Sequence, residues 1–425
     1  MTASSAASVG YVQLIRGNRN FRNLWIGQVI SLLGDWFNLI ASASLIATLT
    51  GSSGLAVGTL LVVRMLAPFA ISPIAGVVAD RYNRKWILVI SDLLRGVAVL
   101  GFLFVQDVSQ IWLLYVLTAV QLGLSGFFHP TRDAILPDIV APEEVGTANA
   151  LSASTWSVML ALGAALGGLV AGLWGVRTAF IIDALTFLLS AFFIYLVSLE
   201  VKPTPKADQT VTAALQEYLD GLRYLGKYKD VLVTVLHKVA IMLILGSAFD
   251  VIQVLVSTDV YNGGWGSDVN LGLMYMMTGI GTGIGPLIIR PFVGDELPRV
   301  RRAILVGYLL GIVGMLTIAP FGGFLIFLFG MLIRGLGIGL IWVFSTQLLL
   351  QLVPSEVRGR VFATEFALFT LGGAIGAWVS GGVLDLVPTL STIIWVLAVL
   401  WLVPTFLWYL WIRRHGATTP SIATE

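Results

Sequence analysis

The sequence predicts an all-α membrane protein of twelve transmembrane helices in two pseudo-symmetric six-helix bundles. Three observations lead to this fold class: the composition, the spacing of apolar segments and an internal repeat. Hydrophobic residues make up 57% of the 425 residues and charged residues 11%, whereas about a quarter of an average soluble domain is charged. A soluble core cannot bury that much apolar surface. Lipid must therefore be the solvent of most of the chain.

Twelve apolar segments are long enough to cross a bilayer, which takes about 20 residues of helix. Six precede a polar stretch in the middle of the chain and six follow it. We expect spans near 23–49, 54–79, 86–105, 110–131, 146–172 and 177–199, then near 238–258, 268–291, 302–319, 322–352, 361–384 and 389–412.

The distribution of basic residues supports this count, because Lys and Arg gather in cytoplasmic loops. The loops at one end of the predicted bundle contain nearly all of them, and the opposite loops contain only Arg177. This pattern places both termini and the central linker in the cytoplasm. The basic clusters lie at 16–22, 81–85, 132, 202–229, 290–302, 358–360 and 413–414.

The predicted spans divide the chain into five parts. They are a cytoplasmic segment (1–20), a first six-helix bundle (21–200), a linker (201–236), a second bundle (237–412) and a cytoplasmic tail (413–425). In the linker, Leu215, Leu219, Leu222 and Leu225 recur at helical spacing among charged residues. This spacing predicts an amphipathic helix, which tethers the two bundles and can lie on the membrane surface.

The two bundles carry matching segments at nearly constant separation. Val78 to Arg84 matches Val293 to Arg299, and Asp35 matches Asp250, both with an offset of 215 residues. Pro142-Glu-Glu-Val matches Pro354-Ser-Glu-Val at an offset of 212. Three matches in chain order indicate two related halves, as in many transporters.

Composition also excludes several functions. The net charge of +2 is too small for nucleic-acid binding by bulk charge. The chain has no cysteine and three histidines, with no metal-ligand spacing. No nucleophile, base and orienting group cluster in the sequence. We therefore expect no enzyme, no metal, no cofactor and no nucleic-acid partner.

A ten-residue motif follows the second span: Gly76-Val-Val-Ala-Asp80-Arg81-Tyr-Asn83-Arg84-Lys85. It resembles the signature loop of the major facilitator superfamily, G-x-x-x-D-R-x-G-R-K. The resemblance implies the major facilitator fold and secondary transport. Other segments, including Gly34-Asp35-Trp36 and Ser91-Asp92-Leu-Leu-Arg95, resemble the drug:proton antiporter branch with macrolide-efflux-like and enterobactin-exporter-like proteins.

The resemblance also implies a cytoplasmic gate made by this loop. Gly76, Asp80, Arg81, Arg84 and Lys85 would fasten the cytoplasmic ends of the halves, and Arg84 would fork onto the carboxylate of Asp133. Asp295 and Arg299 occupy the corresponding loop of the second half. The alternative is ordinary positive-inside anchoring.

The sequence departs from the family pattern at three places. Asn83 replaces the usual glycine, and Asn tolerates left-handed backbone. Related proton antiporters often carry an arginine early in the fourth span, where this chain reads Thr118-Ala-Val-Gln121. They also often carry a Gly-Pro pair in the fifth span, where this chain reads Gly163-Ala-Ala-Leu-Gly167. The last two differences count against proton antiport.

Charged residues inside spans are functional candidates, because each costs about 2.5–3.5 kcal/mol to insert at the centre of a membrane helix. Counted along their helices, Asp35 and Arg64 share a depth, which predicts that they form an ion pair. Asp35 would then be protonated in one conformation and paired in the other, or the pair would only lock the bundle.

Asp250 is the symmetry mate of Asp35 and has no obvious cation nearby in sequence. Arg334 lies in the tenth predicted span, with Glu365 in the eleventh as a potential partner. Asp92 and Arg95 are three residues apart, which predicts a local ion pair on one helix. Asp35, Arg64, Asp250, Arg334 and Glu365 are thus the candidates for proton coupling or for lining a cavity.

We expect proton-coupled efflux of small lipophilic compounds by alternating access, from a monomer in the cell membrane. The partners would be a small lipophilic substrate, protons and membrane lipids. One alternative is a translocator of lysophospholipid or another amphiphile without proton coupling. A second alternative is a membrane receptor or assembly protein that does not transport.

Overall fold

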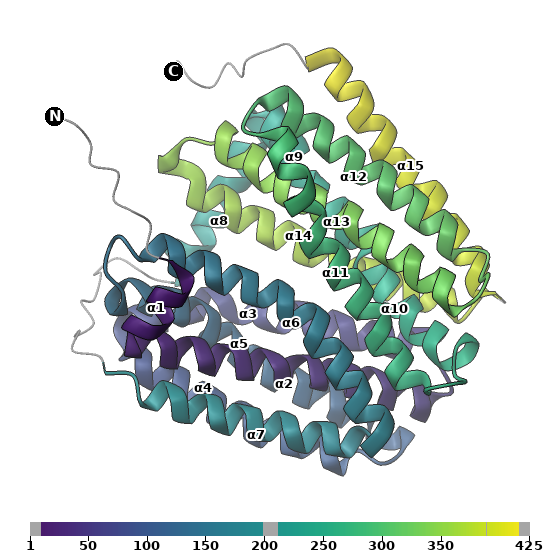
Figure 1. The fold of residues 1–425 in the computed structure, drawn as a ribbon, viewed down its shortest axis with the longest axis horizontal. Coiled ribbons are helices and arrows are strands. Elements are labelled where there is room, and N and C mark those ends of the chain that lie inside the picture. Colours follow the sequence, from purple (N-terminus) through teal and green to yellow (C-terminus); the bar gives the residue numbers. More distant parts are fainter. Residues whose placement is uncertain (1–9, 199–210, 388, 416–425) are drawn as a thin grey trace. The chain divides into compact units, whose positions relative to one another are not determined.

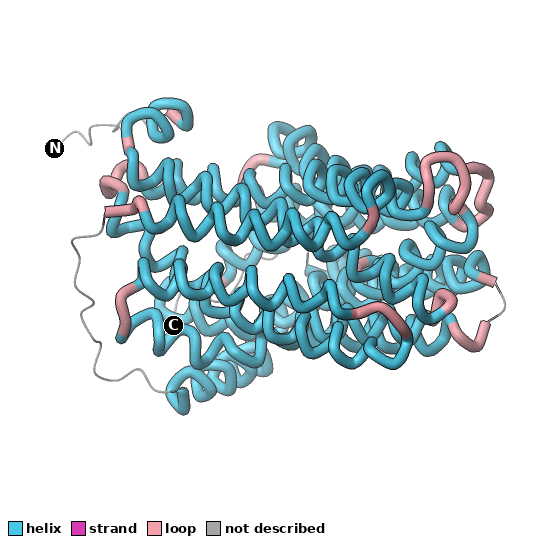
Figure 2. Tube along the Cα trace, turned by 90° about the horizontal axis from the view of Figure 1, so that it is seen from below, coloured by secondary structure: helices cyan, strands magenta, loops and turns pink. Residues whose placement is uncertain are grey.

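The computed structural model describes residues 10–198, 211–387 and 389–415. Figure 1 shows the course of the chain, and Figure 2 shows helix throughout it, with loops only between helices. The first bundle contains a short α1 before six long helices. Its elements are α1 (Tyr11–Gly17), α2 (Arg19–Thr50), α3 (Gly54–Arg81), α4 (Arg84–Gly101), α5 (Ile111–Ile139), α6 (Val145–Trp174) and α7 (Val176–Tyr195).

The remaining helices begin at Val211, within the central linker. They are α8 (Val211–Lys227), α9 (Lys229–Ala240), α10 (Ser247–Leu255), α11 (Ser267–Val293), α12 (Leu297–Ile318), α13 (Phe324–Leu352), α14 (Ser355–Leu384) and α15 (Leu390–His415). Helix α8 lies in the stretch where an amphipathic helix was predicted. The predicted linker residues Lys202 and Lys206 lie outside the described residues.

Twelve helical segments in the described part of the chain are long and apolar enough to cross a membrane, as predicted. The seventh differs from a plain α-helix. It runs from Lys229 to Val260 and includes two π-helical segments, η3 (Ile241–Leu245) and η4 (Val256–Val260). Such segments interrupt the regular backbone ladder and often occur at functional sites.

The contacts divide the chain into two compact units that differ from the two halves of the sequence. Unit 1 contains residues 1–42 and 67–211, and unit 2 contains 43–66 and 212–425. The last turns of α2 and the first turns of α3 therefore pack with unit 2. Within unit 1, α4 packs against α5 and α7. Within unit 2, α13 packs against α11 and α12.

The N-terminal segment contributes to the core of unit 1, although its sequence is polar. Leu14 of α1 is fully buried in a cluster that includes Phe21, Leu88, Ile135 and Ile194. The amide of Asn18 donates to the carbonyl of Ile139 at 2.7 Å. Helix α1 is therefore packed onto the ends of α2, α4, α5 and α7, and it orders that end of the unit.

Candidate functional site

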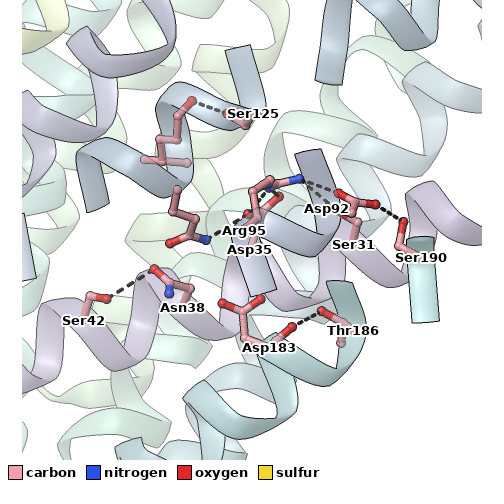
Figure 3. A network of polar contacts seen from close by, with 12 residues as sticks. Ser31, Asp35, Asn38, Ser42, Asp92, Arg95, Ser125, Asp183, Thr186 and Ser190 are labelled. Atoms are coloured by element: carbon pink, nitrogen blue, oxygen red, sulfur yellow. Dashed lines mark hydrogen bonds and ion pairs between the residues drawn. The ribbon is translucent and has the colours of Figure 1, made fainter. Parts of the chain in front are cut away.

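A buried arginine lies at the centre of unit 1 and binds two carboxylates (Figure 3). The Nη2 atom of Arg95, on α4, donates to both oxygens of Asp35, on α2, at 2.7 and 2.8 Å. Its Nη1 atom donates to Oδ1 of Asp92 at 3.2 Å. The predicted local pair of Asp92 and Arg95 is thus confirmed, and Asp35 joins it from another helix.

The sequence predicted Arg64 as a partner of Asp35, and the structure gives Asp35 a partner that was not predicted. Asp35 pairs with Arg95, and Arg64 belongs to the part of α3 that packs in unit 2. The prediction relied on depth along the helices, which can be counted in residues. Depth does not determine which way a side chain points around its helix, and α2 turns Asp35 towards α4.

Further polar groups hold the two carboxylates in place. Ser190 of α7 donates to Oδ2 of Asp92 at 2.6 Å, and Ser31 of α2 accepts from Nη1 of Arg95 at 3.3 Å. Gln121 of α5 donates to Oδ1 of Asp35 at 3.5 Å. Gln121 occupies the stretch where related antiporters often carry arginine, so in this chain the cation beside Asp35 comes from α4 instead.

The network lies in an apolar environment, where charge interactions are strong. The Arg95 guanidinium lies 4.1 Å from the ring centroid of Phe187. The side chains of Arg95 and Asp92 are 1% and 0% exposed, whereas that of Asp35 is 19% exposed. Asp35 is therefore the acid of the pair that a proton or a substrate can reach.

The Gly34-Asp35-Trp36 segment has a packing role at every position. A Cβ atom on Gly34 would lie 2.4 Å from a carboxylate oxygen of Asp183, so glycine is needed for α7 to approach. Trp36 fills the space left by Gly163 of α6, where a Cβ would lie 2.9 Å from its ring. The neighbours of Asp35 thus fix α2 against two other helices.

Asp183 of α7 belongs to the same network. It is fully buried and acts electrostatically on Arg95. His129 of α5 is also within electrostatic range of Arg95 and Asp35. Three carboxylates and one guanidinium therefore share a buried region of unit 1.

Sequence inspection missed Ser31, Gln121 and Ser190, although a signal was present. Polar residues recur at helical spacing along apolar helices, which places them on one face. Figure 3 shows several of these residues converging around Arg95. The polar stripes are Ser31, Asp35, Asn38 and Ser42 on α2; Thr118, Gln121 and Ser125 on α5; and Asp183, Thr186 and Ser190 on α7.

Unit 2 contains a second buried cluster around Asp250 of α10. Its Oδ1 atom accepts from Gln253 at 2.9 Å, and its carboxylate is hydrogen-bonded by Tyr275 of α11. Arg334 and Arg64 both act electrostatically on it. Asp250 therefore has two arginines within range, which corrects the expectation that it lacked a cation.

Arg334 is bound at the break in the seventh span. It donates to the carbonyl of Leu245, at the end of η3, and to Thr278 at 3.2 Å, and it stacks 4.1 Å from the ring of Phe249. Because the π-helical segment and Gly246 interrupt the helix, the Leu245 carbonyl needs a donor from elsewhere. Arg334 supplies it and so joins α13 to the break.

Glu365 does not pair with Arg334, which had been considered as its partner. Its Oε1 atom lies 3.0 Å from Nζ of Lys238 on α9, and both side chains are nearly inaccessible, at 4% and 6% exposed. Nζ of Lys238 also lies 4.7 Å from the ring centroid of Trp342. This buried ion pair ties α14 to α9.

The signature loop of unit 1 uses an acid other than the one predicted. Arg84 Nη1 donates to Asp138 at 2.6 Å and to the carbonyl of Ala134 at 3.0 Å. Asp133 instead pairs with its neighbour Arg132, so the predicted pairing of Arg84 with Asp133 is wrong. Asp138 lies five residues further along α5, on the face turned towards the loop.

Other loop residues have local roles. Asn83 has ordinary extended backbone, not left-handed backbone, and its side chain caps α4 by accepting from Lys85 N–H at 3.0 Å. Nζ of Lys85 lies 4.9 Å from the ring centroid of Tyr195. A Cβ on Gly76 would meet no described atom within 4 Å. The side chain of Asp80 lies outside the described residues, and that of Arg81 is exposed.

The corresponding loop of the second half forms its own network. Asp295 accepts from Arg290 at 2.7 Å and from Gln347 of α13 at 3.0 Å. Arg299 pairs with its neighbour Glu296 at 3.2 Å. The predicted loop residues Asp295 and Arg299 are thus both in ion pairs, but each with a partner in its own segment.

The described residues contain no group of three or more His, Asp or Glu side chains able to hold a metal ion. In the cluster around Arg95, three carboxylates share one guanidinium. Such an arrangement suits proton exchange and conformational switching, with charges that can be re-paired with alternative partners.

Comparison with known proteins gives a consistent result. The family model described as Major Facilitator Superfamily matches residues 24–377 and again 266–425. The MFS-type transporter YfiS of Bacillus subtilis (strain 168) is 28% identical over 379 residues, which cover 87% of this chain and 88% of YfiS. Macrolide efflux protein A of Streptococcus pyogenes is 25% identical over 368 residues, or 84% of this chain and 87% of that protein.

A solved structure has the same fold. The crystal structure of a mutant of the nucleoside transporter NupG aligns with a TM-score of 0.74 at 15% identity, covering 92% of this chain and 99% of NupG. At that identity the likeness concerns the fold alone. It agrees with the predicted two-bundle, all-α membrane architecture.

Proposed function

The chain belongs to the major facilitator superfamily, and from this premise we propose that it is a proton-coupled exporter of small lipophilic compounds. It is a multi-pass membrane transporter and not an enzyme. The efflux of macrolides named for a relative supports export as the direction. The coupling and the substrate class are our proposals.

The sharing of Arg95 between Asp35 and Asp92 is the observation that carries the proposal. A guanidinium that binds two carboxylates can strengthen its hydrogen bonds to one of them while its bonds to the other weaken. It stays paired with an acid throughout. Asp92 is fixed by Ser190 and fully buried, whereas Asp35 is partly exposed. Proton uptake at Asp35 would release Arg95 towards Asp92.

The charge balance of the cluster favours proton binding. Asp35, Asp92 and Asp183 would carry three negative charges against one positive charge on Arg95. Uncompensated charge in a buried apolar region costs several kcal/mol per ion. A proton shared by this cluster lowers that cost, and its arrival or departure changes which pairing is most stable.

In the proposed cycle, substrate and proton bind to different states of the site. Deprotonated Asp35 holds Arg95 between α2 and α4. Protonated Asp35 loses its charge, so α2 and α4 are less tightly joined and a different packing becomes accessible. Opposite movement of substrate and proton follows when each favours a different packing.

The location, membrane topology and oligomeric state of the protein are also proposals. The alternation of basic loops supports a cell-membrane location with both termini in the cytoplasm. We propose that one chain encloses the whole pathway and functions as a monomer, surrounded by membrane lipids. The lipophilic substrate would reach its site from the membrane or the cytoplasm.

Reconstituted protein tests the proposal. Efflux of a macrolide and of a lipophilic fluorescent cation would be measured in proteoliposomes with and without an imposed pH gradient. We expect the gradient to drive transport in the parent protein and not in Asp35→Asn. Asp220→Asn is a matched control, because Asp220 also forms an ion pair with an arginine, Arg223, but at an exposed site.

The result that would overturn the proposal is transport that ignores both the gradient and the Asp35 substitution. With that result, we would assign the protein to uncoupled translocation of lysophospholipid or another amphiphile. Assays with fluorescent lysophospholipid in the same vesicles would then test that alternative.

A further inference from the structure

Residues 43–66 form a hairpin that belongs to the first half by sequence and to unit 2 by packing. This segment, here called the α2–α3 hairpin, contains the last two turns of α2, the loop at 51–53 and the first half of α3. Transport by alternating access requires such cross-packed elements to change partners. The contacts that keep the hairpin on unit 2 are therefore candidates for a role in gating.

Asp385, at the end of α14, supplies the most specific of these contacts. Its Oδ1 atom accepts from the backbone N–H of Gly54 at 2.6 Å, and its Oδ2 atom accepts from the N–H of Leu55 and from the Ser53 hydroxyl, both at 3.1 Å. The first N–H groups of a helix lack intrahelical partners and form its positive end. The carboxylate of α14 thus caps α3.

Close backbone packing surrounds this cap. A Cβ atom on Gly54 would lie 2.6 Å from the carbonyl oxygen of Gly381, and one on Gly58 would lie 2.5 Å from that of Ala377. Small residues at such positions let two helices touch through their backbones. Helices α3 and α14 therefore touch through their backbones, with few side-chain atoms between them. One helix cannot slide gradually along the other.

The loop of the hairpin is held at a second point. The Ser52 hydroxyl donates to Oδ1 of Asp259 at 2.6 Å and lies 3.2 Å from the hydroxyl of Thr258, at the end of the seventh span. Ser52 has φ of +63°, a left-handed conformation that is strained for residues other than glycine. The contact with Asp259 helps to maintain that conformation.

A proline inside α3 follows the hairpin directly. The unit boundary in α3 falls between Leu66 and Ala67, and Pro68 follows directly inside the helix. Proline has no N–H group, so it cannot donate to the carbonyl four residues earlier, and helices bend readily at such sites. The hairpin can therefore move relative to the rest of α3 without breaking that hydrogen bond.

We propose that the α2–α3 hairpin is a hinged gate and that Asp385 is its latch. Release of Asp385 from the start of α3 frees the hairpin from unit 2 and opens the pathway at the end of the bundle opposite the arginine-rich loops. Asp385 acts through the helix that it caps, as a positioning residue. The inference rests on the proposed function only in assuming transport by alternating access.

The absence of cysteine from the sequence makes the test direct. Spin labels on cysteines replacing the exposed residues Thr48, in the hairpin, and Leu325, at the start of α13, would report the hairpin's distance from unit 2. A second pair at Trp265 and Leu325 lies outside the hairpin and serves as an internal reference. Distance distributions would be measured in the reconstituted full chain.

We expect Asp385→Ala to increase the ratio of released to latched hairpin about tenfold, the size expected from losing charge-assisted hydrogen bonds. The Trp265 to Leu325 distance should stay unchanged, which separates gating from unfolding. Asp107→Ala is the matched control. Asp107 also caps a helical turn in a loop, but it accepts from Ser109 in its own segment.

A second variant tests the same gate without touching the latch. Gly58→Ala places a methyl group against the Ala377 carbonyl, so it should shift the hairpin distance in the same direction. Gly382→Ala is its control, since a Cβ there meets no described atom within 4 Å. An unchanged hairpin distance in both Asp385→Ala and Gly58→Ala would overturn the gate. Loss of proton coupling in the parent protein would leave this result intact, so the two proposals fail separately.

Discussion

The Arg95 guanidinium and the Asp35 carboxylate are joined by two hydrogen bonds from one nitrogen, at 2.7 and 2.8 Å, across 60 residues of sequence. The contact joins α4 to α2 inside unit 1, and the second nitrogen of the same guanidinium holds Asp92. Because one cation serves two acids, a change in charge at either acid must alter the bond to the other. Asp35 and Asp92 are therefore coupled through Arg95.

Replacing Arg95 with lysine should reduce efflux at least tenfold while leaving the protein folded. Lysine keeps the positive charge but offers one ammonium group, which cannot bridge Asp35 and Asp92 as a planar guanidinium does. Initial efflux rates in proteoliposomes, normalised to the amount of reconstituted protein, would measure this effect. Arg223→Lys, in the exposed pair with Asp220, should transport normally. A normal rate in Arg95→Lys would mean that bridging is unnecessary.

Replacing Asp92 with asparagine should shift the pH dependence of transport to lower pH. The substitution removes a negative charge near Asp35 and leaves Arg95 to Asp35 alone, which favours the ionised form of Asp35. Protonating Asp35 then requires a higher proton concentration. The pH at half-maximal efflux should therefore be lower in Asp92→Asn than in the parent protein. A shift to higher pH, or none, would show that Asp92 does not act through Arg95.

These expectations depend on contacts of which the sequence predicted only a part. The number and position of the twelve spans follow from the length of helix that a bilayer requires, so hydropathy was sufficient. The Asp92 and Arg95 pair is local and follows from helical spacing. Arg95 was not predicted as a partner of Asp35, because the depth of a residue can be counted along one helix, whereas the direction of its side chain around the axis depends on packing with other helices.

The same limit explains the errors in the cytoplasmic loop and at the break in the seventh span. Asp133 and Asp138 lie five residues apart, about 140° around a helix at about 100° per residue, and the sequence did not show which faces Arg84. The π-helical segments and the role of Arg334 at Leu245 left no sign in the hydropathy. The burial of Leu14 was missed because α1 has only seven residues, too few to be recognised as a membrane span.

The ion pair of Arg84 and Asp138 should matter for transport more than the exposed pair of Arg132 and Asp133. Arg84 binds both Asp138 and the Ala134 carbonyl, so it joins the start of α4 to α5. The Asp133 side chain is 65% exposed, and exposed pairs contribute about 0–1 kcal/mol. We expect Asp138→Asn to slow efflux severalfold and Asp133→Asn to have little effect. Initial efflux rates of the two variants would be compared side by side, and the reverse order would restore the original prediction for Asp133.

The buried pair of Lys238 and Glu365 should be replaceable by apolar residues, although neither member should tolerate removal alone. Both side chains are nearly inaccessible and lie 3.0 Å apart. Removing one partner leaves an uncompensated charge in an apolar interior, which costs about 3–5 kcal/mol, whereas replacing both with residues of similar volume is often neutral. Lys238→Met and Glu365→Leu should each lower the thermal unfolding temperature in detergent, and the double variant should recover it.

If the double variant folds and also transports, the pair serves to pack α14 against α9. If it folds with normal stability but does not transport, Glu365 takes part in the transport cycle itself, and the coupling assigned to Asp35 must extend into the second half.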